Sequence, residues 1–114
     1  MTLAAAAIAW SSLASPATVA HVAAEARVYG VPPALCVAVC LVESGCRGIR
    51  PMGGVGVRVG VVSLRNRLRA NRPARALAVY NAGSWRSARG QRYAVRVLRV
   101  QMYLMRLTAR GDGA

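Results

Sequence analysis

The stretch VYGVPPALCVAVCLVESGCR, residues 28–47, carries one acid, Glu43, near the end of an otherwise apolar segment. If this segment is a helix, the carboxylate is partly withdrawn from water and lies at the negative end of the helix dipole. Both effects raise the pKa of a carboxyl group, and a general acid that works near neutral pH needs such a pKa. The alternative is that Glu43 is exposed and pairs with Arg47.

The chain as a whole is very poor in acids. Its 114 residues include 16 basic ones, all arginine, and the formal net charge is +13. A GC-rich genome explains arginine in place of lysine, but it does not explain why only Glu25, Glu43 and Asp112 are acidic. This charge predicts a polyanionic surrounding, which can be nucleic acid, an anionic cell-wall polymer or an acidic membrane surface.

Arginines recur at helical spacing near the end of the chain, so they gather near one face of a helix. This face either binds polyanions or is simply solvated. The residues that form it are Arg92, Arg96, Arg99, Arg106 and Arg110.

The cysteines do not indicate a metal site. Cys36, Cys40 and Cys46 follow the spacing C-x3-C-x5-C, and the single histidine, His21, lies far upstream. This is poor zinc spacing, and we predict neither a metal nor a cofactor. Cys36 and Cys40 are one helical turn apart, which favours free, buried thiols. A Cys40–Cys46 or Cys36–Cys46 bridge is the alternative.

Proline and glycine mark the elements that must position these residues. We expect an all-α single domain of about five helices, with the glycine-rich segment 45–60 as a loop. The helix that carries Glu43 should be buried on all sides, because nearly every position in it is apolar. The expected helices span residues 16–29, 32–44, 61–71, 73–82 and 91–109. We expect Val61, Leu64 and Leu68 to face inward from the helix at 61–71. The apolar residues of the helix at 91–109 are Val97, Leu98, Leu104, Met105 and Leu107.

The N-terminal segment, residues 1–15, is apolar and without charged side chains. Small residues toward its end are weakly similar to a signal-peptide cleavage region, but a basic n-region is lacking. Serine and proline interrupt it too often for a membrane span. An ordinary N-terminal helix pair is therefore favoured over a cleaved signal or anchor. The expected domain covers residues 16–110, followed by a tail at 111–114.

Three short motifs follow one another along the expected helices. The segment YGVPPAL leads into Glu43-Ser44-Gly45, a later helix ends in Tyr80-Asn81-Ala82-Gly83, and Tyr93-Ala94 opens the next helix. Over roughly residues 20–108 this order resembles the lytic transglycosylases of the lysozyme superfamily, the soluble-type and goose-type branch. The resemblance implies a small lysozyme-like domain that degrades peptidoglycan.

The resemblance also implies roles for single residues. Glu43 is then the general acid and afterwards the base at the bond between N-acetylmuramic acid and N-acetylglucosamine. The muramic C6 hydroxyl closes a 1,6-anhydro ring, so the pair of carboxylates that most glycosidases use is not needed. Substrate-binding roles fall to Ser44, Tyr80, Asn81 and Tyr93. Their structural alternatives are a helix-end hydroxyl, a core tyrosine, a turn-fixing amide and a packing aromatic, and Trp85 is open to the same choice between sugar stacking and packing.

One segment departs from the family. Transglycosylases of this branch carry Gly-Leu-Met-Gln in the cleft floor, whereas this chain has PMGGVGVRVGV at residues 51–61, with Met52 as a remnant. The cleft is then rebuilt, completed by a partner, or degraded. A second function class stays open for this reason: a non-enzymatic, arginine-rich virion protein that binds nucleic acid or other virion proteins.

The expected location follows from the same features. A minimal arginine-rich domain of this kind suits a bacteriophage particle that opens the cell wall locally. A cellular enzyme exported to the periplasm or another extracytoplasmic space is the alternative. The expected partners are peptidoglycan strands and, in the particle, other virion proteins or nucleic acid.

Overall fold

Six helices make up the regular structure of the part of the chain that the computed structural model describes, residues 1–48, 51–52 and 56–109. The all-α prediction is confirmed, and the count is one above the expected five. The helices are α1 Leu3–Trp10, α2 Pro16–Val28, α3 Pro33–Ser44, α4 Val57–Ala70, α5 Pro73–Ala82 and α6 Ala88–Thr108.

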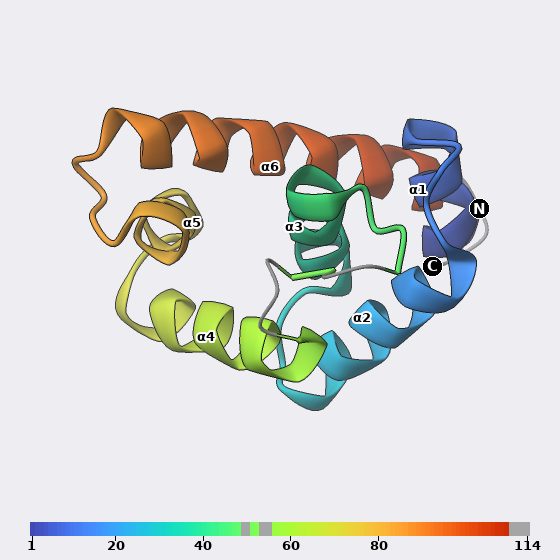
Figure 1. The fold of residues 1–114 in the computed structure, drawn as a ribbon, viewed down its shortest axis with the longest axis horizontal. Coiled ribbons are helices and arrows are strands. Elements are labelled where there is room, and N and C mark those ends of the chain that lie inside the picture. The colour runs from blue at the N-terminus through green and yellow to red at the C-terminus, as the bar shows by residue number, and fades with distance from the viewer. Residues whose placement is uncertain (49–50, 53–55, 110–114) are drawn as a thin grey trace.

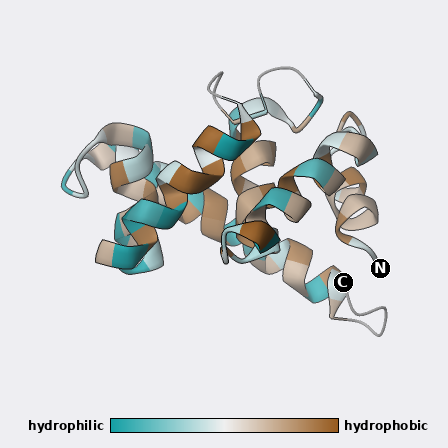
Figure 2. Ribbon diagram, turned by 90° about the horizontal axis from the view of Figure 1, so that it is seen from below, coloured by the Kyte–Doolittle hydropathy of each residue, from teal (hydrophilic) through white to brown (hydrophobic). Residues whose placement is uncertain are grey.

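Helix α3 lies at the centre of the fold, between the long α6 and α2 (Figure 1). Every residue from Leu35 to Leu41 is buried, as its apolar sequence predicts. Complete burial of a valine or leucine side chain contributes about 1.5–3 kcal/mol, so this helix is a large part of the core. Figure 2 shows hydrophobic and hydrophilic residues interleaved along the helices, the pattern of helices that turn one side to the core.

Several helices begin or end at the serine, proline or glycine residues that the sequence predicts. The Ser15 hydroxyl accepts a hydrogen bond of 3.3 Å from the Thr18 amide and so caps α2. Helices α3 and α5 end at Gly45 and Gly83, whose φ angles of 73° and 76° lie in the left-handed region that favours glycine. These two ends matter because Glu43 and Asn81 lie within the last turn before them.

Two helices begin earlier than predicted. Helix α4 begins at Val57 instead of residue 61, so Gly60 is a helical residue and not part of the loop, and it packs on Met52. Helix α6 begins at Ala88 instead of residue 91, because the Ser87 hydroxyl caps it by accepting from the Gly90 amide at 3.2 Å.

The buried side of α6 packs on α5 and α3. Of the apolar residues of this helix, Val97 and Leu104 are buried, whereas Met105 is 51% exposed. Met105 follows Leu104 directly, and one residue is a turn of about 100° around a helix. The buried residues of α6 are Gly90, Ala94, Val97, Val100, Leu104 and Thr108.

Helix α1 packs into the same core as the rest of the chain. Ala6 and Ala7 are fully buried, and Trp10 contacts Tyr103 of α6 with ring centroids 5.2 Å apart. The N-terminal segment expected as a helix is therefore helical and docked. Within the described residues, every helix is too short or too polar to cross a lipid bilayer.

The expectation that all three cysteines are free is wrong. Cys40 and Cys46 form a disulfide, and Cys36 alone is free and buried. The chain reverses direction after α3, because Gly45 and Cys46 both adopt positive φ angles. This reversal brings the Cα atoms of Cys40 and Cys46 to 5.0 Å, a normal separation for a disulfide.

Candidate active site

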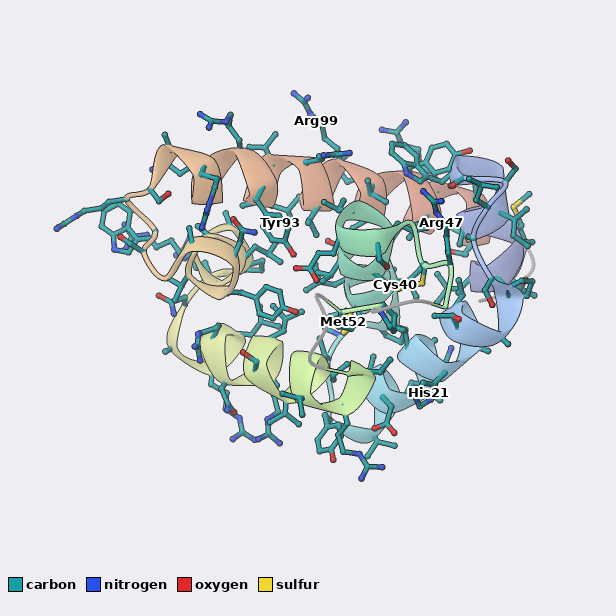
Figure 3. All side chains as sticks on the ribbon, in the orientation of Figure 1. His21, Cys40, Arg47, Met52, Tyr93 and Arg99 are labelled. Atoms are coloured by element: carbon teal, nitrogen blue, oxygen red, sulfur yellow. A yellow bond between two sulfur atoms is a disulfide. The ribbon has the colours of Figure 1, made fainter. Side chains whose placement is uncertain are left out.

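Glu43 lies in the last turn of α3 and faces α6. Its Oε1 atom accepts a hydrogen bond of 3.0 Å from the Tyr93 hydroxyl, while Oε2 is buried and has no partner. Figure 3 shows Tyr93 pointing from α6 toward α3. The carboxyl group is thus held at one oxygen and left unsatisfied at the other.

Burial raises the pKa of Glu43, and the hydrogen bond from Tyr93 lowers it by less. The net direction is upward, as the sequence predicted for an acid at the end of an apolar helix. The alternative of an ion pair with Arg47 is wrong: the Arg47 side chain is exposed and packs beside Gly45. A carboxyl group in this environment favours the neutral form more than an exposed glutamate does.

Tyr80, from α5, lies on the same side of Glu43 as Tyr93. The two rings are nearly parallel, with an angle of 25° between them, and their centroids are 6.5 Å apart. Burial and the charge of Glu43 raise the pKa of both tyrosines. Both hydroxyls therefore stay neutral, and each keeps its proton for donation to an oxygen atom.

A cavity of about 260 Å³ opens beside the acid. Asn81 forms part of its wall, and the Asn81 Oδ1 atom is buried without a hydrogen-bond partner. Unpaired buried polar atoms are uncommon and costly, and two residues that line this cavity, Glu43 and Asn81, each have one. Its lining residues are Glu43, Met52, Val59, Gly60, Ser63, Tyr80 and Asn81.

Met52 provides an apolar wall of this cavity. Its side chain is only 1% exposed and fills the space next to Gly60, where an added Cβ would lie 2.7 Å from the Met52 Cβ. The residue interpreted as a remnant of the family's cleft segment is therefore a built part of the cavity. The neighbouring residues 53–55 lie outside the described part of the chain.

Ser44 does not join the cavity lining. Its hydroxyl lies 3.1 Å from the Cys40 carbonyl and 3.2 Å from the Pro51 carbonyl, and it accepts a hydrogen bond from the Cys46 amide. The substrate-binding role expected for Ser44 is therefore replaced by the structural alternative, a hydroxyl that fastens the turn after α3. Together with the Cys40–Cys46 disulfide, it fixes the backbone on both sides of Glu43.

A second cavity, of about 660 Å³, adjoins the first. Asn81 lines both, and Tyr93 connects the second cavity to Glu43 through its hydroxyl. Arginines dominate the polar part of this second lining. The residues are Val42, Asn81, Arg89, Arg92, Tyr93 and Arg96.

The other acids lie elsewhere. Glu25 pairs with Arg58 at 3.3 Å, where α2 meets the start of α4. Asp112 lies outside the described residues. Among residues 1–48, 51–52 and 56–109, Glu43 is thus the one carboxylate that lines either cavity. The same residues contain no cluster of three metal-ligating side chains.

The remaining predicted site residues divide between cavity and outer surface. Arg92 and Arg96 line the second cavity, and Arg106 is exposed near the end of α6. Arg99 points away from the core in Figure 3. Arg110 lies outside the described residues. Trp85 contacts Arg75 and Arg86, whose guanidinium carbons are 4.0 and 4.9 Å from its ring centroid, and it lines neither cavity.

Sequence reasoning missed several lining residues. Arg89 was detectable, because it lies three and seven residues before Arg92 and Arg96 and so shares their side of the helix. Gly60 was interpreted as part of a loop, although a glycine inside a helix often marks close packing. Val42 and Ser63 carried no signal that separates them from ordinary helix residues.

No family model, curated protein or solved structure matches this chain.

Proposed function

We propose that this protein is a peptidoglycan lytic transglycosylase with Glu43 as its general acid and base. The observation that carries the proposal is the environment of Glu43. It is half-buried, and its carboxyl group accepts a hydrogen bond of 3.0 Å from the Tyr93 hydroxyl. Its pKa is raised by burial, and it lines a cavity together with Tyr80 and Asn81. These are the residues that the family resemblance assigns to the site.

The first step is proton transfer. The neutral carboxyl group carries its proton on Oε2, because Oε1 accepts the Tyr93 hydroxyl. Since Oε2 is covered in this structure, the Glu43 side chain turns into the cavity when a saccharide occupies it. The proton passes to the glycosidic oxygen, and the bond from that oxygen to C1 of the muramic residue breaks.

The second step uses a nucleophile from the substrate. The Glu43 carboxylate takes the proton of the muramic C6 hydroxyl, and this oxygen bonds to C1 to close the 1,6-anhydro ring. No water is consumed, so the reaction suits a site with a single carboxylate. The Tyr80 and Tyr93 hydroxyls are close enough to Glu43 for its charge to raise the pKa of both, and they stabilise the carboxylate between the two steps.

The disulfide supports the expected location outside the cytoplasm. Bonds such as Cys40–Cys46 persist in oxidising surroundings and are rare in the reducing cytosol. A virion, the periplasm and other extracytoplasmic spaces all fit this condition, and peptidoglycan lies there.

The experiment compares wild type with Glu43→Gln and Glu25→Gln on purified sacculi. We expect wild type and Glu25→Gln to release products that end in 1,6-anhydromuramic acid, lighter by one water than hydrolysis products. Glu43→Gln should keep its fold, measured by circular dichroism, and release none. Equal release by Glu43→Gln, or products with reducing ends, would contradict the proposed mechanism.

A second candidate function is polyanion binding by the outer side of α6. Arg92, Arg99 and Arg106 repeat every seven residues and are all exposed, and seven residues return to nearly the same side of a helix. Among the described residues, none of the three has an ion-pair partner. This arrangement supports the alternative of a nucleic-acid-binding virion protein.

Heparin and duplex DNA test this second function. Wild type should be retained, and retention should fall steeply with salt because bound phosphates release counterions. Arg99→Gln/Arg106→Gln should elute at lower salt than Arg67→Gln/Arg69→Gln, a change of equal charge on α4. If the two double variants elute at the same salt concentration, net charge explains the retention, and the outer side of α6 is not a specific polyanion-binding surface.

A further inference from the structure

The cavity next to the acid is strongly basic. Arg89, Arg92 and Arg96 line it from one side of α6, together with Tyr93 and Asn81. Steps of three and four residues place successive side chains on one helix face. The cavity measures about 660 Å³ and shares Asn81 with the cavity of Glu43. Three positively charged side chains therefore line the cavity that adjoins the Glu43 cavity.

These charges are not neutralised within the described part of the chain. The ion pair found there joins Arg58 and Glu25, on α4 and α2. Glu43 is the carboxylate nearest to these arginines along the site, and its Oε1 accepts a hydrogen bond from Tyr93 instead of from an arginine. Like charges three and four residues apart on a helix destabilise it, so an anion that enters this cavity relieves repulsion in addition to forming its own contacts.

The side-chain type indicates the class of anion. A guanidinium group presents a planar set of donors that matches a carboxylate in pairs of parallel hydrogen bonds. In a peptidoglycan strand the sugar rings are neutral. The carboxylates belong to the substituent of muramic acid, either the free lactyl group or the stem peptide attached to it.

We infer that Arg89, Arg92 and Arg96 form an anion subsite that binds the carboxylates of the muramic substituent. This inference rests on the proposed function, because it takes the ligand of the adjacent cavity to be a glycan strand. The subsite selects strands that carry carboxylates over neutral strands of the same length. It also sets which sugar lies next to Glu43, since only alternate residues of the strand bear the substituent.

The test measures binding separately from cleavage. The Glu43→Gln protein is titrated with two glycan preparations of equal length. One is peptide-free and retains the lactyl carboxylates, and in the other the carboxylates have been converted to neutral amides. We expect about five- to tenfold tighter binding of the charged strands, the range for a few partly exposed charge pairs. The preference should fall toward one in the Glu43→Gln/Arg89→Gln/Arg96→Gln protein, while binding of the amidated strands stays the same.

The control is Glu43→Gln/Arg69→Gln, which removes a positive charge from α4 outside both cavities. It should keep the preference. The subsite would be overturned if the parent protein bound the amidated strands as tightly as both charged preparations, the peptide-free strands and the strands with intact stem peptides. A loss in the Arg69 control as large as in the cavity variant would overturn it too, because net charge would then explain the effect. If the double arginine change unfolds the protein, Arg89→Gln alone provides the same comparison.

Two further measurements distinguish the lactyl carboxylate from the stem-peptide carboxylates, and the anion subsite from the transglycosylase activity. Strands with intact stem peptides that bind tighter than peptide-free strands assign the subsite to the stem carboxylates, and the reverse order assigns it to the lactyl group. Wild type that prefers charged strands but makes no anhydro products contradicts the transglycosylase and keeps the anion site. Wild type that cleaves charged and amidated strands equally well contradicts the subsite and keeps the transglycosylase.

Discussion

The Tyr93 hydroxyl donates a 3.0 Å hydrogen bond to Oε1 of Glu43 across 50 residues of sequence. The bond joins the end of the central helix α3 to the first turns of α6. Of the influences on the Glu43 pKa, burial raises it and this bond lowers it. The charge state of the acid is therefore adjusted from α6.

Replacement of Tyr93 by phenylalanine should raise the pKa of Glu43 further. The bond stabilises the carboxylate, and its loss favours the neutral form. The proposed general acid acts in its protonated form, so under that proposal the high-pH limb of the activity profile should move to higher pH. The measurement that does not need activity is a carbon NMR titration of glutamate-labelled protein, which shows two side-chain carboxyl signals because the chain has only Glu25 and Glu43.

Tyr103→Phe is the control for this prediction, since Tyr103 lies on the same helix and contacts Trp10 instead of the acid. Its titration curves should match those of wild type. A Glu43 signal that titrates at lower pH in Tyr93→Phe than in wild type would contradict the assigned role of the bond.

The raised pKa of Glu43 also predicts how stability depends on pH. Below its unfolded-state pKa, Glu43 is neutral in both states and costs the fold nothing. As pH rises toward the higher folded-state pKa, the unfolded chain releases the proton first, so the free energy of unfolding falls. Glu43→Gln removes this loss, and its stability relative to wild type should grow as pH rises through that window.

Urea unfolding at a series of pH values measures this difference. Glu25→Gln is the reference, because Glu25 forms the ion pair with Arg58 and lies outside the cavities. A constant difference between Glu43→Gln and wild type at all pH values would show that Glu43 has the same pKa in both states.

The cysteines predict a countable result with a thiol reagent. Burial raises the pKa of the Cys36 thiol to about 12, and only thiolates react. Native protein should therefore show almost no reaction at pH 8. Unfolding without reductant should expose one thiol, Cys36, and unfolding after reduction should expose all three. Three thiols before reduction would show that the Cys40–Cys46 bond does not form.

Gly90 fixes the distance between α5 and α6. A Cβ at this position would lie 2.9 Å from the Ala78 carbonyl oxygen and 3.1 Å from the Ala82 Cβ. Gly90→Val should therefore destabilise the protein by about 1–3 kcal/mol through overpacking. Ala88→Val, at an exposed position on the same helix, should cost well under half of that. Thermal unfolding measures both, and equal losses would mean that β-branching explains the effect.

The sequence predicted the helices well because their ends are marked locally. Ser15, Pro33 and Gly45 act through their own backbone and side-chain preferences, which do not depend on the rest of the fold. The start of α4 is predicted too late for the opposite reason: Gly60 lies inside the helix, where the Met52 side chain occupies the space that a Cβ would need. Contacts of that kind are set by tertiary packing, which short-range patterns do not encode.

The candidate site was predictable in part. Glu43, Tyr80 and Asn81 lie at the ends of helices whose stop signals are visible, and the structure brings all three to one cavity. The hydrogen bond from Tyr93 depends on how α6 crosses α3, so its partner was not readable from spacing. Ser44 is next to Glu43 in the sequence, and the family resemblance implies a substrate-binding role for it. Its hydroxyl instead bonds backbone carbonyl groups of the turn after α3.

The Cys40–Cys46 bond closes a short covalent ring that contains the acid and ends before Arg47. Residues beyond the ring reach the cavity through Met52, whereas Glu43 is held inside it. The position of the Glu43 carboxyl group is therefore independent of the length of the segment that follows Cys46. Changes to that segment at Met52 should therefore reshape the cavity wall while Glu43 keeps its position on α3.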